Sequence, residues 1–321
     1  MKPYVLSVVV PVCNEAENIE PLYAGLQPVL QAACPDGYEI IFVDDGSTDT
    51  TQQKVGAIHS QNARVKLLSL SRNFGKEVAL SSGIAHALGE AILTMDGDGQ
   101  HPPDLIPDFL EKWRQGAQVV VGVRRANKNE GVVKKYGSKL FYMLFNNLSG
   151  AKLVPGSSDY RLIDSAVQRE FVKLREPHSI ARGLIDWLGF ERAYISYNAS
   201  ERHAGVASYK FHKLIRLAAH SFVSLSPTPL YIFGYLGLGI TIVSFVLGTT
   251  VLVEQILLGD PLSWDFTGTA MLSILVIFLV GMLLVAQGVL ALYVSYIYTQ
   301  SKDRPLYVVN NRDSLGMQVE A

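Results

Sequence analysis

Five short apolar runs follow one another at regular intervals in the first 125 residues, and this rhythm restricts the fold more than any other feature of the chain. Segments long enough for helices separate the runs. Strands that alternate with helices form a mostly parallel sheet with right-handed crossovers. The sequence therefore predicts an α/β domain of the nucleotide-binding type, whose ligands bind at the carboxyl ends of the strands. The predicted strands lie at about 4–11, 38–43, 65–70, 90–95 and 118–123.

Composition separates this domain from the remainder of the chain. The 321 residues include 28 basic and 29 acidic ones, and a formal net charge of −1 argues against nucleic acid as a partner. A hydrophobic content of 49% and a mean hydropathy of +0.20 are too apolar for an ordinary soluble enzyme. The apolar excess lies after residue 229. Cys13 and Cys34 lack the spacing of metal ligands and favour reduced thiols in a cytosolic domain.

Two apolar segments, at about 230–256 and about 270–298, are each long enough to cross a bilayer core of about 30 Å. The loop at 258–268 contains no lysine or arginine, whereas basic residues precede the first segment and follow the second. By the positive-inside rule both flanks lie in the cytoplasm. We therefore expect a two-helix transmembrane hairpin within 229–299, in a multi-pass protein of the bacterial inner membrane with a cytoplasmic catalytic domain at residues 1–205.

Further segments flank the predicted membrane helices. Residues 132–148 combine lysines with an apolar helical face, which fits packing on the sheet and a membrane-surface helix equally well. Residues 206–228 predict a second, amphipathic interfacial segment. Residues 300–321 form a cytoplasmic tail, in which 304–309 favours a short strand that pairs with another chain in a homo-oligomer. The residues after about 313 are expected to be loosely held.

The fourth apolar run ends at two carboxylates spaced one residue apart, Asp96 and Asp98. Residues i and i+2 of an extended backbone project to the same side, so both carboxylates can converge on one point. Hard oxygen ligands at a strand end suit Mg²⁺ or Mn²⁺, and a diphosphate would complete the site. An Asp-x-Asp triplet recurs by chance, so its weight depends on the motifs around it.

Polar motifs also follow the first three predicted strands. Asp44 and Asp45 end the second strand beside the loop after the first, which suits a ribose or a base edge. The residues that follow them, 47–49, are equally good helix caps. The third strand leads through 71–77 into a helix whose N-terminus favours anions.

Four motifs at these strand ends resemble those of the family-2 glycosyltransferases with the GT-A fold, and in particular the polyprenyl-phosphate glycosyltransferases, such as undecaprenyl-phosphate glucosyltransferase and dolichol-phosphate mannose synthase. The motifs are Pro-Val-Cys-Asn-Glu at 11–15, Asp-Asp-Gly-Ser at 44–47, Arg-Asn-Phe-Gly-Lys at 72–76 and Asp-Gly-Asp-Gly-Gln at 96–100. The resemblance implies that the nucleoside contacts are Pro11, Glu15 and Asp45, and that metal and diphosphate are surrounded by Asp96, Asp98 and Gln100. We place in the same nucleotide-sugar site Asn14, Asp44 and Lys76, which belong to the same motifs.

Two arginines end the fifth predicted strand. A guanidinium fork binds two phosphate oxygens at once, which suits Arg124 and Arg125 for phosphate recognition. For Arg125 a solvated charge is an equal alternative. For Arg124 the resembling family also has an arginine, so we count it among the catalytic residues.

The acceptor side is predicted from two later segments. In the resembling transferases an aspartate followed two residues later by an arginine lies near the acceptor, which here selects Asp159 and Arg161. A phosphate monoester with a second pKa of about 6 is already a nucleophile at neutral pH. We therefore assign Asp159 to positioning, with base catalysis as the second choice. A family segment further on is matched by Arg202, while Ser208 and Lys210 stand in for its Ser-Lys pair.

Together these features predict an inverting transferase that moves a hexose, glucose above all, from a UDP-sugar to polyprenyl phosphate with the help of Mg²⁺ or Mn²⁺. Two alternatives stay open. A processive polysaccharide synthase shares the fold, but this chain lacks a Gln-x-x-Arg-Trp sequence. A catalytically idle membrane scaffold for a flippase partner would not need the Asp-x-Asp motif. The sugar, the base and the lipid length are not encoded in any motif.

Overall fold

The structure is a computed structural model that describes residues 3–125, 156–174, 181–198, 268–302 and 304–317, together with a few isolated positions between 235 and 246. Compact packing divides the chain into two units, one formed by residues 1–214 with 304–321 and the other by residues 215–303.

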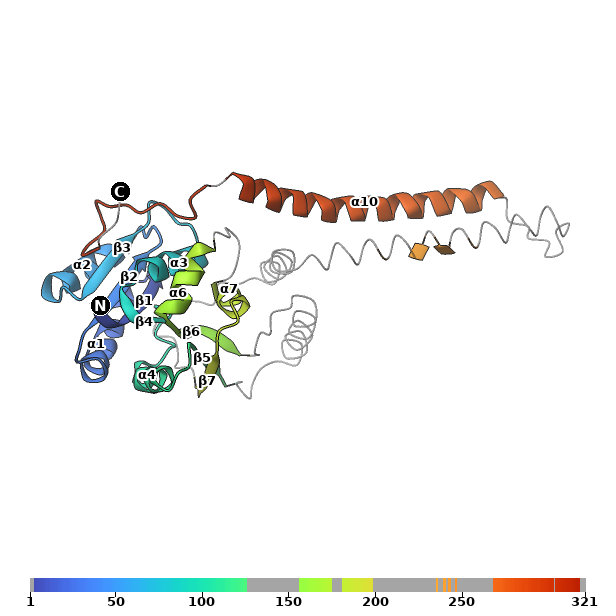
Figure 1. The fold of residues 1–321 in the computed structure, drawn as a ribbon. Helices are drawn as coiled ribbons and strands as arrows, with labels where there is room; N and C mark the ends of the chain where they lie inside the picture. The colour runs from blue at the N-terminus through green and yellow to red at the C-terminus, as the bar shows by residue number, and fades with distance from the viewer. Residues whose placement is uncertain are drawn as a thin grey trace. The chain divides into compact units, whose positions relative to one another are not determined.

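In the first unit the described strands form one sheet with the order β3-β2-β1-β4-β6-β5-β7 (Figure 1). The strands are β1 (Tyr4–Val12), β2 (Tyr38–Asp44), β3 (Val65–Ser69), β4 (Gly89–Thr94), β5 (Val119–Arg124), β6 (Ser157–Asp164) and β7 (Arg192–Tyr197). The first five agree with the predicted runs to within about one residue at most ends. Strands β3, β2, β1 and β4 are parallel, as predicted for strands joined by helical crossovers.

The sheet changes character after β4. Strand β6 pairs antiparallel with β4 on one side and with β5 on the other, so β5 does not lie beside β4 as simple alternation would place it. Strand β7 then extends the sheet parallel to β5. This insertion brings the start of β6 next to the end of β4, because Thr94 is the register partner of Arg161.

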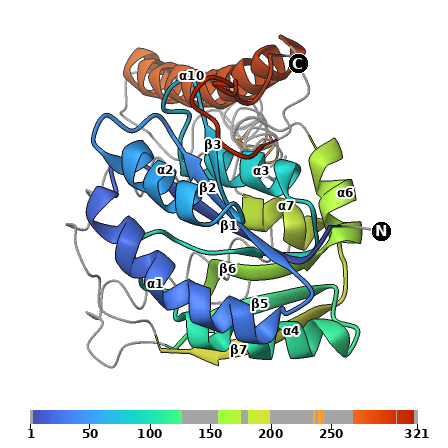
Figure 2. The same ribbon diagram turned by 90° about the vertical axis from the view of Figure 1, so that its left-hand side faces the viewer.

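Helices cover both faces of the sheet (Figure 2). One face packs against α1, α2 and α4, and the other against α3, α6 and α7. The helical segments are α1 (Ala16–Ala33), α2 (Thr51–Gln61), α3 (Lys76–His86), the short 3₁₀ turn η1 (Pro103–Leu105), α4 (Ile106–Arg114), α6 (Ser165–Lys173) and α7 (Ala181–Trp187). Helices on both faces are what keep a largely parallel sheet out of water.

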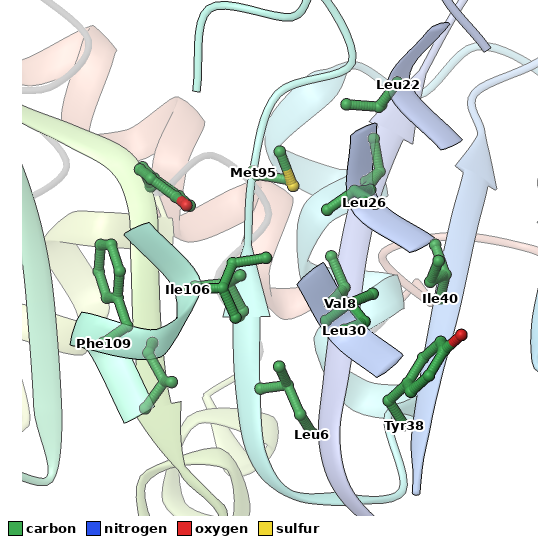
Figure 3. Packing of buried hydrophobic residues seen from close by; sticks show 14 of the residues in the cluster. Leu6, Val8, Leu22, Leu26, Leu30, Tyr38, Ile40, Met95, Ile106 and Phe109 are labelled. Carbon is green, nitrogen blue, oxygen red and sulfur yellow. The ribbon is translucent and has the colours of Figure 1, made fainter. Parts of the chain in front are cut away.

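The core beneath α1 shows how the apolar pattern is used (Figure 3). Leu22, Leu26 and Leu30 are spaced four residues apart on α1 and therefore lie on one face of the helix. They pack with Val8 of β1 and Ile40 of β2 in one buried cluster. Each fully buried side chain of this kind contributes about 1.5–3 kcal/mol to folding, so this face fixes the helix firmly on the sheet.

In the second unit the main described element is α10 (Gly268–Ser301). Its window at 278–295 has a mean hydropathy of 2.1 and is 0% buried, so by length and composition this helix can cross a membrane. It coincides with the second predicted apolar segment. The first, at about 230–256, lies almost entirely outside the described residues, as do the predicted interfacial stretches at 132–148 and 206–228.

The C-terminal tail departs from its prediction. Val309 and Leu315 form antiparallel bridges with Leu70 and Leu67, so in this structure the tail pairs with β3, and with the residue that follows it, in its own chain. The expectation that residues after about 313 are loosely held is wrong for 314–317, because backbone hydrogen bonds and apolar packing fix them there.

Candidate active site

The carboxyl ends of β1, β2 and β4 meet at one edge of the sheet and carry most of the predicted site. A cavity of about 290 Å³ opens there. It is lined by Pro11, Val12, Cys13, Glu15, Asp45, Asn73, Gly75 and Lys76. The first, second and third predicted motifs therefore come together around one cavity.

Asp45 joins the second motif to the third. Its carboxylate accepts hydrogen bonds from the backbone N–H groups of Phe74 at 2.7 Å and Gly75 at 2.9 Å. Burial raises the pKa of Asp45, and those two N–H groups act against the rise. Gly46 has a φ of +68°, and a Cβ there would lie 2.6 Å from the backbone nitrogen of Asn73. The loop 72–75 is therefore packed directly on the end of β2.

Asn14 and Asp44 mainly brace the loops around the cavity. Asn14, at a φ of 56°, donates its N–H to Ser47 Oγ and accepts the N–H of Thr48 on its side-chain oxygen at 2.8 Å. Asp44 is completely buried, and its carboxylate accepts from the Ser47 N–H and from Gln52 Nε2 at 2.6 Å. Because it is buried, Asp44 is not accessible to a ribose or a base in this structure. Its carboxylate instead holds the β2–α2 loop.

A cluster of opposite charges lies where β4 and β6 adjoin. Lys76 Nζ lies 2.7 Å from Asp96 Oδ1 and 2.9 Å from Asp159 Oδ2. Burial opposes the charged form of Lys76, but the two carboxylates outweigh it and hold its pKa above its usual range. Burial likewise acts to raise the pKa of Asp159, whereas the charges of Lys76 and Arg182 lower it below its usual range. Both members of this pair are therefore ionised at neutral pH.

Asp159 is brought to the site by its strand pairing. Thr94 at the end of β4 donates its hydroxyl to the Asp159 carbonyl at 2.5 Å, which fixes the start of β6 beside the Asp-x-Asp loop. Asp159 Oδ1 is buried and has no hydrogen-bond partner among the described residues. A buried carboxylate oxygen without a partner is costly, so this atom is a ready acceptor for a ligand.

Arg161 lies between β6 and α7. Its side chain is 1% exposed, with Nη1 at 3.0 Å from Asp186 Oδ1 and Nε donating to the Ser158 carbonyl. Nη1 also donates to the Arg182 carbonyl at 3.2 Å. Nη2 is buried and has no hydrogen-bond partner among the described residues. The contacts of this guanidinium fix α7 against β6.

Asp98 and Gln100 lie in the loop after β4, where the Gln100 N–H donates to Asp98 Oδ1 at 3.1 Å. Carboxylate and amide oxygens are the ligands that Mg²⁺ and Mn²⁺ prefer. Asp96 already attracts a cation, the ammonium group of Lys76. The three side chains therefore fit a divalent ion in their chemistry. Within the described part of the chain no group of three His, Cys, Asp or Glu side chains is placed to hold a metal ion.

Five predicted site residues remain to be placed, two at the end of β5 and three further along the chain. Arg124 and Arg125 end β5 with exposed side chains, and their backbone N–H groups bond to Gly156 and Tyr197. These exposed guanidiniums are accessible to a phosphate. Arg202, Ser208 and Lys210 lie outside the described residues.

Sequence reasoning missed the support beneath the Asp-x-Asp loop. His101 is 4% exposed and accepts the Asp96 N–H on Nδ1 at 2.9 Å, so its proton is on Nε2. Burial lowers its pKa and keeps the ring neutral. The ring stacks on Tyr160 at 4.8 Å, and the Tyr160 hydroxyl bonds to the Pro102 carbonyl. The only signal in the sequence was the position of His101 directly after the motif.

Glu77 is a second residue that sequence reasoning passed over. Its carboxylate accepts the Ala181 N–H at 2.9 Å and so ties α7 to the start of α3, next to Lys76. Burial and the nearby charge of Asp159 raise its pKa. No sequence pattern separates this glutamate from a solvated one, because its partner is more than 100 residues away.

The fold and this edge of charged and amide groups define an α/β enzyme domain of the nucleotide-sugar-binding GT-A class, as predicted. Residues 7–171 match the family described as Glycosyl transferase family 2. An uncharacterized glycosyltransferase of Synechocystis sp. is 36% identical over 306 residues, which cover 95% of each chain. The chain therefore belongs to glycosyl transferase family 2 and is a glycosyltransferase.

Two further comparisons carry more specific names. A bactoprenol glucosyl transferase of Shigella phage SfV is 35% identical over 306 residues, which cover 95% of this chain and 98% of that protein. A crystal structure of glucosyl-3-phosphoglycerate synthase from Mycobacterium tuberculosis, in complex with Mn²⁺, UDP-glucose and phosphoglyceric acid, is 19% identical. It has a TM-score of 0.48 and covers 69% of this chain and 78% of that one.

Proposed function

We propose that this protein transfers glucose from UDP-glucose to a polyprenyl phosphate, with inversion at the anomeric carbon, and produces a sugar linked to the lipid through one phosphate. The observation that carries the proposal is the junction of the nucleoside cavity with the Lys76–Asp96–Asp159 cluster. Relatives named bactoprenol glucosyl transferase that match along nearly the whole chain support the donor sugar and the lipid acceptor.

The nucleoside would occupy the cavity beside Asp45, and the diphosphate would lie toward the Asp-x-Asp loop. A divalent cation held by Asp96, Asp98 and Gln100 would supply positive charge against the charge that develops on the departing diphosphate. Lys76 would donate to diphosphate oxygens as well. Its ammonium lies beside the Asp-x-Asp loop, at hydrogen-bond distance from Asp96 and Asp159.

The acceptor phosphate needs orientation more than deprotonation. Its oxygen attacks the anomeric carbon, the bond from that carbon to the diphosphate breaks, and UDP leaves. We assign the orientation to Arg124, whose exposed fork suits a phosphate, and to Asp159, which would act through the Lys76 ammonium that it holds at 2.9 Å. The residues predicted with them, Arg202, Ser208 and Lys210, remain proposed contacts with the lipid headgroup or the diphosphate.

The products test the chemistry directly. Detergent-solubilised protein is incubated with UDP-glucose, undecaprenyl phosphate and Mn²⁺, and nucleotide and lipid are identified by mass spectrometry. UDP together with a monophosphate-linked glycolipid supports the proposal. UMP, or sugar found only on a soluble glycan, would rule it out. The matched controls are Asp96→Asn, which we expect to be inactive, and Asp108→Asn, which changes an exposed carboxylate of α4 and should keep activity.

Association with a membrane follows from a polyprenyl acceptor and agrees with the apolar length of α10. We propose the inner membrane of a bacterium, two spans and a cytoplasmic catalytic domain. In an otherwise cysteine-free chain, Thr267→Cys in the predicted external loop should react with an impermeant thiol reagent on intact cells. Arg312→Cys in the tail should not. Reaction of the tail variant alone would show that the topology is the reverse of the one proposed.

A further inference from the structure

The C-terminal tail, residues 304–317, lies along the edge strand of the catalytic sheet (Figure 1). Leu67 and Leu315 exchange backbone hydrogen bonds of 3.0 and 2.8 Å. The Asn310 N–H donates to the Ser69 carbonyl at 2.8 Å, and the Ser69 N–H donates to Ser314 Oγ at 3.1 Å. The backbone groups of β3 that an edge strand would leave unpaired are therefore bound by the tail.

Apolar side chains of the tail pack on both faces of the sheet. Leu315 joins the cluster under α1, whereas Tyr307, Val309 and Met317 join the cluster under α3. The Tyr307 ring lies 5.9 Å from the ring of His86, the last residue of α3. The tail therefore holds two elements at once, the strand that precedes the loop 71–75 and the helix that follows it.

One hydrogen bond links the tail directly to the loop 71–75. The Ser71 N–H donates to the Val308 carbonyl at 2.9 Å, three residues before Phe74, the first residue whose amide binds Asp45. The preceding residue, Leu70, donates its N–H to the Asp44 carbonyl at 2.9 Å. The start of the loop is thus held between β2 on one side and the tail on the other, and its end carries Lys76.

We propose that the tail is a positioning element of the nucleotide site. It fixes the course of the loop 71–75, and through that loop the amides that hold Asp45 and the side chain of Lys76. The proposal rests on the proposed function, because it takes the cavity beside Asp45 as the site of a nucleoside diphosphate. Without the tail, Ser71 has lost its partner, β3 has become an open edge, and the loop has more conformations to lose when a nucleotide binds.

The competing explanation is that the tail only covers a sheet edge. A cover of that kind would change the stability of the fold, but it would leave nucleotide affinity and the loop amides of the folded protein as they are. The two explanations therefore differ in what happens to the loop while the sheet is intact.

The test uses the full chain and a chain that stops before Arg304, both in detergent. Binding of UDP in the presence of Mn²⁺ is measured by titration calorimetry, and amide hydrogen exchange is followed without nucleotide. We expect UDP binding to weaken roughly 5- to 100-fold in the shortened chain, a range typical of coupling between distinct parts of a protein. We also expect faster exchange at Ser71, Phe74 and Gly75, with the amides of β1 still protected.

Leu315→Ser keeps the test decisive if the shortened chain does not fold, because it removes one apolar anchor and leaves the chain complete. Arg312→Ala is the matched control, since that side chain is exposed and only the backbone N–H of Arg312 bonds within the tail. Unchanged UDP affinity together with unchanged loop exchange in Leu315→Ser and in a folded shortened chain would overturn the proposal. Failure of the full chain to bind UDP would instead overturn the proposed function, while the exchange data would still report on the tail.

Discussion

Two charged clusters begin two residues apart on β6, and they differ in almost every physical respect. Asp159 joins Lys76 and Asp96 in a cluster whose lysine side chain is 44% exposed. Arg161 pairs with Asp186 in a cluster in which the two side chains are 1% and 4% exposed. Each cluster keeps one buried polar atom without a hydrogen-bond partner among the described residues, Asp159 Oδ1 in the first and Arg161 Nη2 in the second, but only the second ties α7 to the sheet. The two charged residues of one Asp-x-Arg motif can therefore have different roles, with the aspartate at the site and the arginine in the packing of a helix.

The largest effect should come from breaking the buried cluster. Asp186→Ala leaves the Arg161 guanidinium buried without its counter-charge, and we expect a loss of about 3–5 kcal/mol in the free energy of unfolding. Urea unfolding followed by circular dichroism measures it, with Asp108→Ala as the exposed control. An unchanged midpoint for Asp186→Ala would mean that the pair does not hold α7.

The next effect concerns activity at the Asp-x-Asp loop, beside the cluster of Lys76, Asp96 and Asp159. Asp98→Asn should lower the rate of transfer by about 100-fold or more, because charge on the departing diphosphate is no longer balanced. Metal-dependent UDP binding should be lost while the unfolding midpoint stays near that of the unaltered protein. Near-normal turnover of this variant at saturating Mn²⁺ would remove Asp98 from the metal site.

Lys76→Met sharpens the contrast between the two clusters. The Lys76 side chain is 44% exposed, but those of Asp96 and Asp159 are 28% and 12% exposed and would lose their counter-charge. We expect a loss of about 1–3 kcal/mol in the free energy of unfolding, smaller than that of Asp186→Ala. Affinity for UDP should fall about tenfold, since a cation beside the diphosphate is lost. A loss of stability as large as that of Asp186→Ala would show that the cluster is structural.

The smallest effect is expected at Arg124, which lies outside both clusters. Arg124→Ala should leave stability and UDP affinity unchanged and raise the amount of polyprenyl phosphate needed for half-maximal rate by severalfold. Arg114→Ala is the control, because it removes an exposed arginine at the end of α4 that no motif assigns to the site. If UDP affinity changed instead, Arg124 would belong to the donor side.

Local patterns in the sequence were sufficient for most of the catalytic fold. The alternation of strands and helices placed the first five strands, and the motifs at their ends predicted that Asp45, Lys76 and Asp96 would share one edge of the sheet. This works because parallel strands with helical crossovers must end at the same edge. Residue types alone did not separate a carboxylate that faces a ligand from one that braces a loop, as Asp44 demonstrates.

Only the tertiary structure decided where distant segments meet. The insertion of β6 between β4 and β5 brings Asp159 to Lys76, and the packing of α7 buries Arg161. The docking of residues 304–317 on β3 joins two segments more than 200 residues apart. The sequence by itself determined the class of domain, the family motifs and the apolar helix, because these depend on neighbours a few positions away. Contacts between remote segments depend on which surfaces remain uncovered after the sheet has formed, and no local pattern records that.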